Sequence, residues 1–118
     1  MKPYDSPKAL DLFLKDQVAY HFLEEEDGKE WLVEGDEAIG DVYIEGLAIN
    51  GKSPSDTPLK SLLGGQTSAF CTLKGEGSVE YEGSGYRDFT FAGSCEIDLD
   101  GNMDDISIES VRFDGTGD

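Results

Sequence analysis

The feature that most constrains the fold is a regular alternation of apolar and polar residues in the C-terminal third of the chain. In an extended conformation, one face of residues 89–99 carries Gly93 together with Phe89, Phe91, Cys95, Ile97 and Leu99. The opposite face carries Thr90, Ser94, Glu96 and Asp98. A period of two is typical of an antiparallel sheet that has one buried face and one face in water.

Other strand-like runs lie on both sides of this segment, and glycine-rich turns separate them. SAFCTLKGEG and SVEYEG precede it, and DDISIESVRF follows after a turn at Asp100-Gly101. Upstream, DVYIEGLAING predicts a strand from about Asp41 to Ile49, with Gly46 as a bulge. The pattern predicts an antiparallel meander, either as an open sheet or as a partly open barrel.

Two helices are predicted beside this sheet. The first begins at Ser6-Pro7, with Ser6 as the N-cap and Pro7 at the first helical position. Its apolar face holds Leu10, Phe13 and Leu14, and Val18 can extend it. The second is the short segment PLKSLL, which Thr57-Pro58 opens and Gly64-Gly65 ends.

The segment VAYHFLEEEDGKEWLVEG has two interpretations. It can continue the first helix, or it can form a hairpin that turns at Asp27-Gly28. We favour the hairpin, because the run is β-branched and aromatic and Asp-Gly is a strong two-residue turn signal. In that arrangement Val18, Tyr20 and Phe22 share one face.

The chain has 118 residues, with neither an internal repeat nor a linker that separates two cores. We therefore expect a single α+β domain over residues 1–118, with residues 114–118 frayed. An N-terminal helix and a short second helix pack on a predominantly antiparallel, meander-type sheet or partly open barrel.

The chain has a large negative charge. Nine lysines and arginines against 26 acidic residues give a net charge of −17. This charge repels phosphate, so direct binding to nucleic acid or to an anionic membrane is not expected. The N-terminus lacks a signal-peptide core, and the expected location is cytoplasmic. Cys71 and Cys95 are expected as two buried thiols, with a cross-strand disulfide as the alternative.

Motifs for catalysis are absent from the sequence. His21 is the single histidine, and no serine lies in a GxSxG pattern. A dyad of His21 with Cys71 or Cys95 is a minor alternative, and these three residues lack the spacing of a zinc site. We therefore expect a protein that is not an enzyme, without catalytic residues, metal or cofactor.

One segment has part of a calcium-loop pattern. Asp98, Asp100, Asn102 and Glu109 occupy positions 1, 3, 5 and 12 of such a loop. However, Met103 stands at position 6, where the sharp turn needs glycine, and the flanking segments alternate like strands. The favoured interpretation is a hairpin turn, with weak binding of a divalent cation as the alternative.

The acidic residues concentrate in residues 24–37 and 88–109. We expect a binding surface for a basic protein partner made by Glu24, Glu25, Glu26, Asp27, Glu30, Glu34, Asp36, Glu37, Glu96, Asp98, Asp100, Asp104, Asp105 and Glu109. Two adjacent strands with such rows would carry one charge per ~3.4 Å, the value for a single DNA strand. A plain solvated face is the alternative. An exposed Trp31 or Tyr43 would anchor the contact, although Trp31 is expected mainly in the core.

These features favour a small acidic inhibitor that mimics nucleic acid and blocks the basic cleft of a nucleic-acid enzyme. Anti-restriction and anti-CRISPR proteins are the natural setting for such a molecule, by analogy of size and charge alone. One alternative is an immunity or chaperone-like protein that neutralises a basic toxin or effector. Others are a barrel that binds a small ligand, and a salt-adapted domain without a charge-driven partner.

Overall fold

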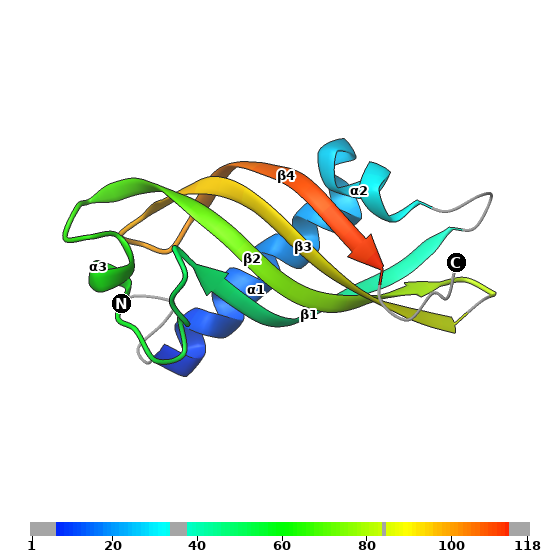
Figure 1. The fold of residues 1–118 in the computed structure, drawn as a ribbon, viewed down its shortest axis with the longest axis horizontal. Helices are drawn as coiled ribbons and strands as arrows, with labels where there is room; N and C mark the ends of the chain where they lie inside the picture. Colours follow the sequence, from blue (N-terminus) through cyan, green and yellow to red (C-terminus); the bar gives the residue numbers. More distant parts are fainter. Residues whose placement is uncertain (1–6, 34–37, 84, 114–118) are drawn as a thin grey trace.

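The computed structural model describes residues 7–33, 38–83 and 85–113, which form a layer of helices against a four-stranded sheet (Figure 1). In chain order the elements are α1 (Pro7–Glu24), α2 (Glu26–Leu32), β1 (Ile39–Ile49), α3 (Leu59–Leu62), β2 (Ser68–Tyr81), β3 (Gly85–Asp98) and β4 (Met103–Phe113). The expected α+β class is confirmed. The predicted N-cap Ser6 and the predicted fraying of 114–118 lie outside the described residues.

The sheet is an antiparallel meander in the order β1-β2-β3-β4. Strands β1 and β4 are both edges, so the described sheet is not closed into a barrel. The predicted turn at Asp100-Gly101 is present, with Gly101 at φ 80°. The register of β1 shifts between Ile44 and Gly46, which confirms the predicted bulge. Gly64 and Gly65, both at positive φ, follow α3 as predicted.

The expectation of two separate strands over residues 68–81 is wrong. SAFCTLKGEG and SVEYEG form the single 14-residue strand β2. Gly75 and Gly77 lie inside β2 because neighbouring groups come too close for a side chain. A Cβ on Gly75 would lie 2.5 Å from the carbonyl oxygen of Gly46, and one on Gly77 would meet that of Tyr43. The glycines therefore permit close strand contact rather than a turn.

The predicted hairpin after residue 17 is also wrong, because α1 continues to Glu24. Leu10, Leu14, Val18 and Phe22 recur at intervals of four residues and are all buried. This stripe lies against the sheet, which α1 crosses diagonally (Figure 1). Burial of the stripe outweighs the modest β preference of the sequence from Val18 to Phe22. Tyr20, on the opposite side of the helix, is 61% exposed.

The Asp27-Gly28 pair lies inside α2 rather than at a turn. Gly28 is buried where α2 crosses the end of α1, and a Cβ there would lie 2.5 Å from the carbonyl oxygen of His21. The glycine therefore sets the close packing of two helices. Trp31, expected mainly in the core, is 37% exposed.

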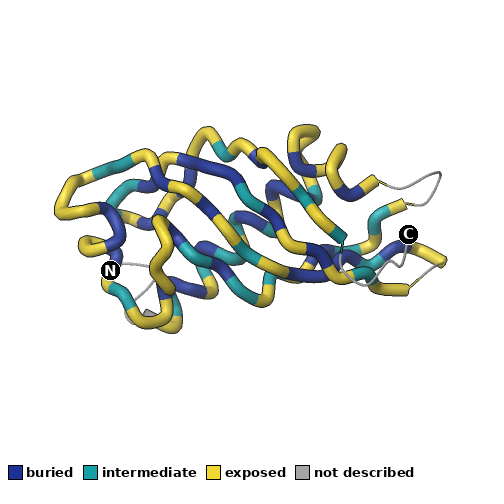
Figure 2. The backbone as a smooth tube through the Cα atoms, in the orientation of Figure 1, coloured by how far each residue is buried: buried dark blue, intermediate teal, exposed yellow. Residues whose placement is uncertain are grey.

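The core lies between α1 and the inner face of the sheet, and Figure 2 shows buried segments along the middle of the strands. At its centre Phe22 packs edge-to-face on Phe89 and Phe91, with 5.3 Å between ring centroids in each pair. Cys71 and Cys95 pair across β2 and β3 as buried free thiols, as expected. Among the described residues, no helix is long and apolar enough to cross a membrane.

Candidate functional site

The structure brings the two predicted acidic stretches together beside the edge strand β4. The Asp27 carboxylate of α2 accepts a hydrogen bond from the Ile108 amide of β4, at 2.9 Å. The same Oδ2 atom lies 2.9 Å from Nε2 of His21 on α1. One carboxylate therefore joins α1, α2 and β4.

The first acidic stretch, residues 24–37, was predicted to lie on the face of a strand, and this prediction is wrong for its described residues. Glu24 ends α1, Glu25 precedes α2, and Glu26, Asp27 and Glu30 lie on α2. Helical side chains point in several directions, so the charge spacing expected for two adjacent strands does not hold here. Glu34, Asp36 and Glu37 lie outside the described residues.

In the second stretch, one predicted site residue has a structural role. The Asp98 carboxylate accepts hydrogen bonds from the amides of Asp100 and Asn102, at 2.9 and 3.1 Å, and so stabilises the hairpin turn. Glu96 and Asp104, in contrast, are exposed and are direct partners across β3 and β4. Among the described residues, no group of His, Cys, Asp or Glu is arranged to hold a metal ion.

Most charge on the sheet lies on the face directed away from α1, called here the outer face. Its described side chains include two cations, Lys74 and Arg112, and eight carboxylates: Asp41, Glu45, Glu76, Glu80, Asp88, Glu96, Asp104 and Glu109. Five of these, those at 41, 45, 76, 80 and 88, were missing from the predicted site. Their alternation within each strand was a usable signal, but only the strand register shows that they share one face.

Two rungs of the outer face place like charges directly opposite each other. Asp41 pairs with Glu80, and Glu96 pairs with Asp104. None of these four forms an ion pair with a lysine or arginine that the structure describes. Like charges directly opposite each other destabilise a sheet. Such rungs are less favourable for the sheet than rungs of opposite charge would be.

Exposed aromatic side chains lie among these carboxylates. Phe70, 71% exposed, shares a rung with Glu96. Tyr43 and Tyr86 form a second group, with ring centroids 6.0 Å apart. Partial burial raises the pKa of Tyr43 to about 12, and the charges of Asp41 and its neighbours act in the same direction. Exposed aromatics are the residue type that anchors protein interfaces.

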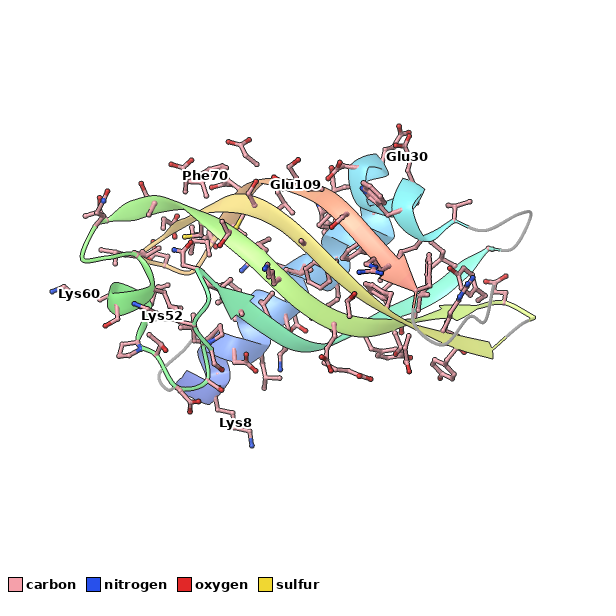
Figure 3. The ribbon with its side chains drawn as sticks, viewed as in Figure 1. Lys8, Glu30, Lys52, Lys60, Phe70 and Glu109 are labelled. Atoms are coloured by element: carbon pink, nitrogen blue, oxygen red, sulfur yellow. The ribbon has the colours of Figure 1, made fainter. Side chains whose placement is uncertain are left out.

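The charge is unevenly distributed over the molecule. Figure 3 shows Lys8, Lys52 and Lys60 on the lower left of the view, and Phe70, Glu109 and Glu30 along its upper side. Over the 44 Å long axis, eight carboxylates amount to one per about 5.5 Å. A DNA strand carries one charge per ~3.4 Å, so the outer face is less dense than one strand.

A groove of about 610 Å³ lies between α1 and the start of β4. Its described lining includes the apolar side chains of Phe13, Tyr20 and Ile106 and the acidic residues Asp16, Glu25, Asp104 and Asp105. Neither lysine nor arginine is among the residues lining it. His21 also lines the groove, but neither cysteine does.

The two thiols lack the features of a nucleophile. Burial raises the pKa of Cys95 to about 12, and burial also raises the pKa of Cys71. Both are therefore protonated near neutral pH, whereas thiol chemistry requires the thiolate. The geometry of the described residues accordingly favours binding over nucleophilic chemistry at these cysteines.

The Asp27 contact predicts a pH-dependent contribution to stability. Burial alone would raise the pKa of Asp27, but hydrogen bonds from His21 and the Ile108 amide outweigh it and lower the pKa. A lowered pKa stabilises the fold above about pH 4, and this stabilisation disappears as the pH falls through the folded-state pKa. We expect Asp27→Asn to lose about 1 kcal/mol at pH 7, since the carboxylate is 45% exposed.

Urea denaturation at pH 7 and pH 3 measures this difference, which should shrink at the lower pH. Glu30→Gln removes one exposed charge from the same helix and should change stability by less than about 0.5 kcal/mol at both values. An equal loss at pH 7 and pH 3 would contradict the role of the ionised carboxylate.

Comparison of the chain with protein-family models, curated proteins and solved structures finds no match.

Proposed function

We propose that the protein is a small acidic inhibitor that binds a basic protein surface through the outer face of its sheet. The observation that carries the proposal is the pair of like-charged rungs, Asp41 with Glu80 and Glu96 with Asp104. Their mutual repulsion is relieved when arginine or lysine side chains of a partner approach. Binding then gains the attraction to the partner and also removes a cost present in the free protein.

The exposed aromatics support the same surface. Phe70 lies beside Glu96, and Tyr43 and Tyr86 lie near Asp41 and Glu80. Aromatic anchors surrounded by charge are typical of interfaces, in which a few large side chains supply most of the binding energy.

The partner that we propose is a nucleic-acid enzyme, blocked at its basic cleft as by anti-restriction or anti-CRISPR proteins. A cleft built for phosphates offers the cations that the outer face needs, and the opposite fields speed association. Because the charge spacing is wider than in DNA, the aromatic contacts must add to the electrostatic attraction.

We expect the double variant Glu80→Lys/Glu96→Lys to weaken inhibition by about 100-fold without loss of stability. Each new lysine lies opposite an acid, Asp41 or Asp104, so each substitution converts a repulsive rung into an attractive one. In the complex, in contrast, each new lysine repels the basic cleft of the partner, which the original glutamate attracts. The melting temperature should stay equal or rise.

The assay begins with capture from the native host at low salt and elution in a salt gradient. The captured nucleic-acid enzyme is then assayed with increasing amounts of the protein, and inhibition should be complete at a 1:1 ratio and decrease as salt is raised. A matched control is Ser53→Lys/Ser55→Lys/Asp56→Lys. It changes the net charge by the same +4, from −17 to −13, in an exposed loop before α3.

Equal inhibition by the double variant and the wild type would rule out the outer face as the binding surface. Equal weakening by both charge variants would show that net charge alone acts. Capture of a basic toxin or effector without nucleic-acid activity would favour the immunity-protein alternative. Unfolding of the wild type in dilute buffer would favour the salt-adapted alternative.

A further inference from the structure

We infer that the groove between α1 and β4 receives an arginine side chain of the protein partner. This inference rests on the proposed function, and it adds a specific anchoring site to an electrostatic surface. The groove lies between α1 and the start of β4, and of the eight described outer-face carboxylates only Asp104 also lines it.

One wall of the groove comes from α1. Phe13, Asp16 and Tyr20 recur at intervals of three and four residues, so they lie along the same side of the helix. The buried core stripe uses a different side, and Tyr20 remains 61% exposed. The helix therefore presents an aromatic and acidic surface that does not contribute to the core.

The opposite wall comes from an irregular stretch of β4. The register against β3 shifts where Ser94 faces Ser107 and Glu96 faces Asp104, and Asp105 has φ 54°. In a regular strand, Asp104 and Asp105 would point to opposite faces. Asp104 keeps its position opposite Glu96 and borders the groove, and Asp105, which lies at the bulge, lines the groove as well.

Two polar contacts hold the walls at a fixed separation. The Gln17 side chain donates to the Gly101 carbonyl at 2.7 Å and accepts from the Met103 amide at 2.8 Å. At the other end, Asp27 binds the Ile108 amide. The edge strand is thus fixed to the helices on both sides of the bulge, and the groove is preformed.

An arginine fits these walls better than other side chains. The planar guanidinium stacks on an aromatic ring such as Tyr20 and binds carboxylates through several donors. Its aliphatic stem can cover Phe13 and Ile106. The volume of about 610 Å³ lies within the range of ligand sites, about 300–1,000 Å³, and accommodates a short peptide segment around the arginine.

The test uses the full chain and the peptide acetyl-Ala-Ala-Arg-Ala-Ala-amide, followed by NMR shifts of the backbone amides at low salt. Shifts are expected at Tyr20 and Ile106 and not at Tyr43. The same peptide with citrulline, a neutral isostere, should show no binding, and the lysine peptide should bind several-fold more weakly.

Asp16→Asn/Asp105→Asn should weaken binding of the arginine peptide by about tenfold. Asparagine tolerates the positive φ at residue 105, so the bulge is retained. The matched control Asp41→Asn/Asp88→Asn removes two charges from the outer face and should change binding by less than about twofold.

Equal weakening by the two double variants, shifts confined to the outer face, or equal binding of the citrulline or lysine peptide would each overturn the inference. The titration needs no enzyme, so its failure is distinct from failure of the inhibition assay. A different outcome is that the outer-face variants alter inhibition as expected while the arginine peptide does not bind in the groove. That result would support the proposed function and would contradict the role of the groove in it.

Discussion

Replacing Phe22 by alanine is expected to destabilise the protein by about 3–5 kcal/mol, the largest effect of any single truncation proposed for this fold. The side chain is fully buried and contacts Phe89 and Phe91 edge-to-face at 5.3 Å. Truncation removes both aromatic pairs and leaves a cavity between α1 and the sheet. Domains of this size are stable by only about 5–15 kcal/mol, so a large share of the stability is lost.

Urea denaturation followed by circular dichroism measures this loss, and Tyr20→Ala provides the control. Tyr20 lies two residues earlier on α1 and is 61% exposed, so its truncation should cost about 0.5 kcal/mol or less. A strand through residues 18–22 would place Tyr20 and Phe22 on the same face. Similar losses for the two variants would therefore contradict the helix.

Gly28→Ala is expected to destabilise the protein by about 2–3 kcal/mol and to lower Tm by about 10 °C. In an ordinary helix this change stabilises, because alanine is the better helix former by about 1 kcal/mol. Here the new Cβ would lie 2.5 Å from the His21 carbonyl oxygen and 2.7 Å from the Phe22 Cα. These are backbone atoms of α1, so the clash is relieved only if α2 moves away.

Thermal unfolding of Gly28→Ala and Glu30→Ala tests the sign of this effect. Glu30 is exposed on the same helix, and its replacement should change stability by less than about 0.5 kcal/mol. A raised Tm for Gly28→Ala would show that α2 does not pack closely on α1. Because Asp27 joins α2 to β4, a displaced α2 should also alter NMR shifts near Ile108.

The sequence predicts how many acidic residues the surface carries, but it does not predict which of them lie beside each other. The alternation of residues 89–98 placed Glu96 on the wet face of a strand, as observed. The sequence around Asp27 also predicted exposed acids. However, the contact of Asp27 with Ile108 spans 81 residues, and no local pattern reports such a contact. The rungs of Asp41 with Glu80 and Glu96 with Asp104 likewise depend on register.

The sequence by itself determined the antiparallel meander, its single wet face and the net charge of −17, because each depends on residue type and short-range alternation. Tertiary packing decided the rest. It extended α1 to Glu24, since burial of Val18 and Phe22 against the sheet outweighs weak local preferences. It also placed Gly28 and Gly77 at close backbone contacts instead of turns. Glycine suits both situations, because it lacks a side chain and because it adopts backbone conformations that other residues avoid.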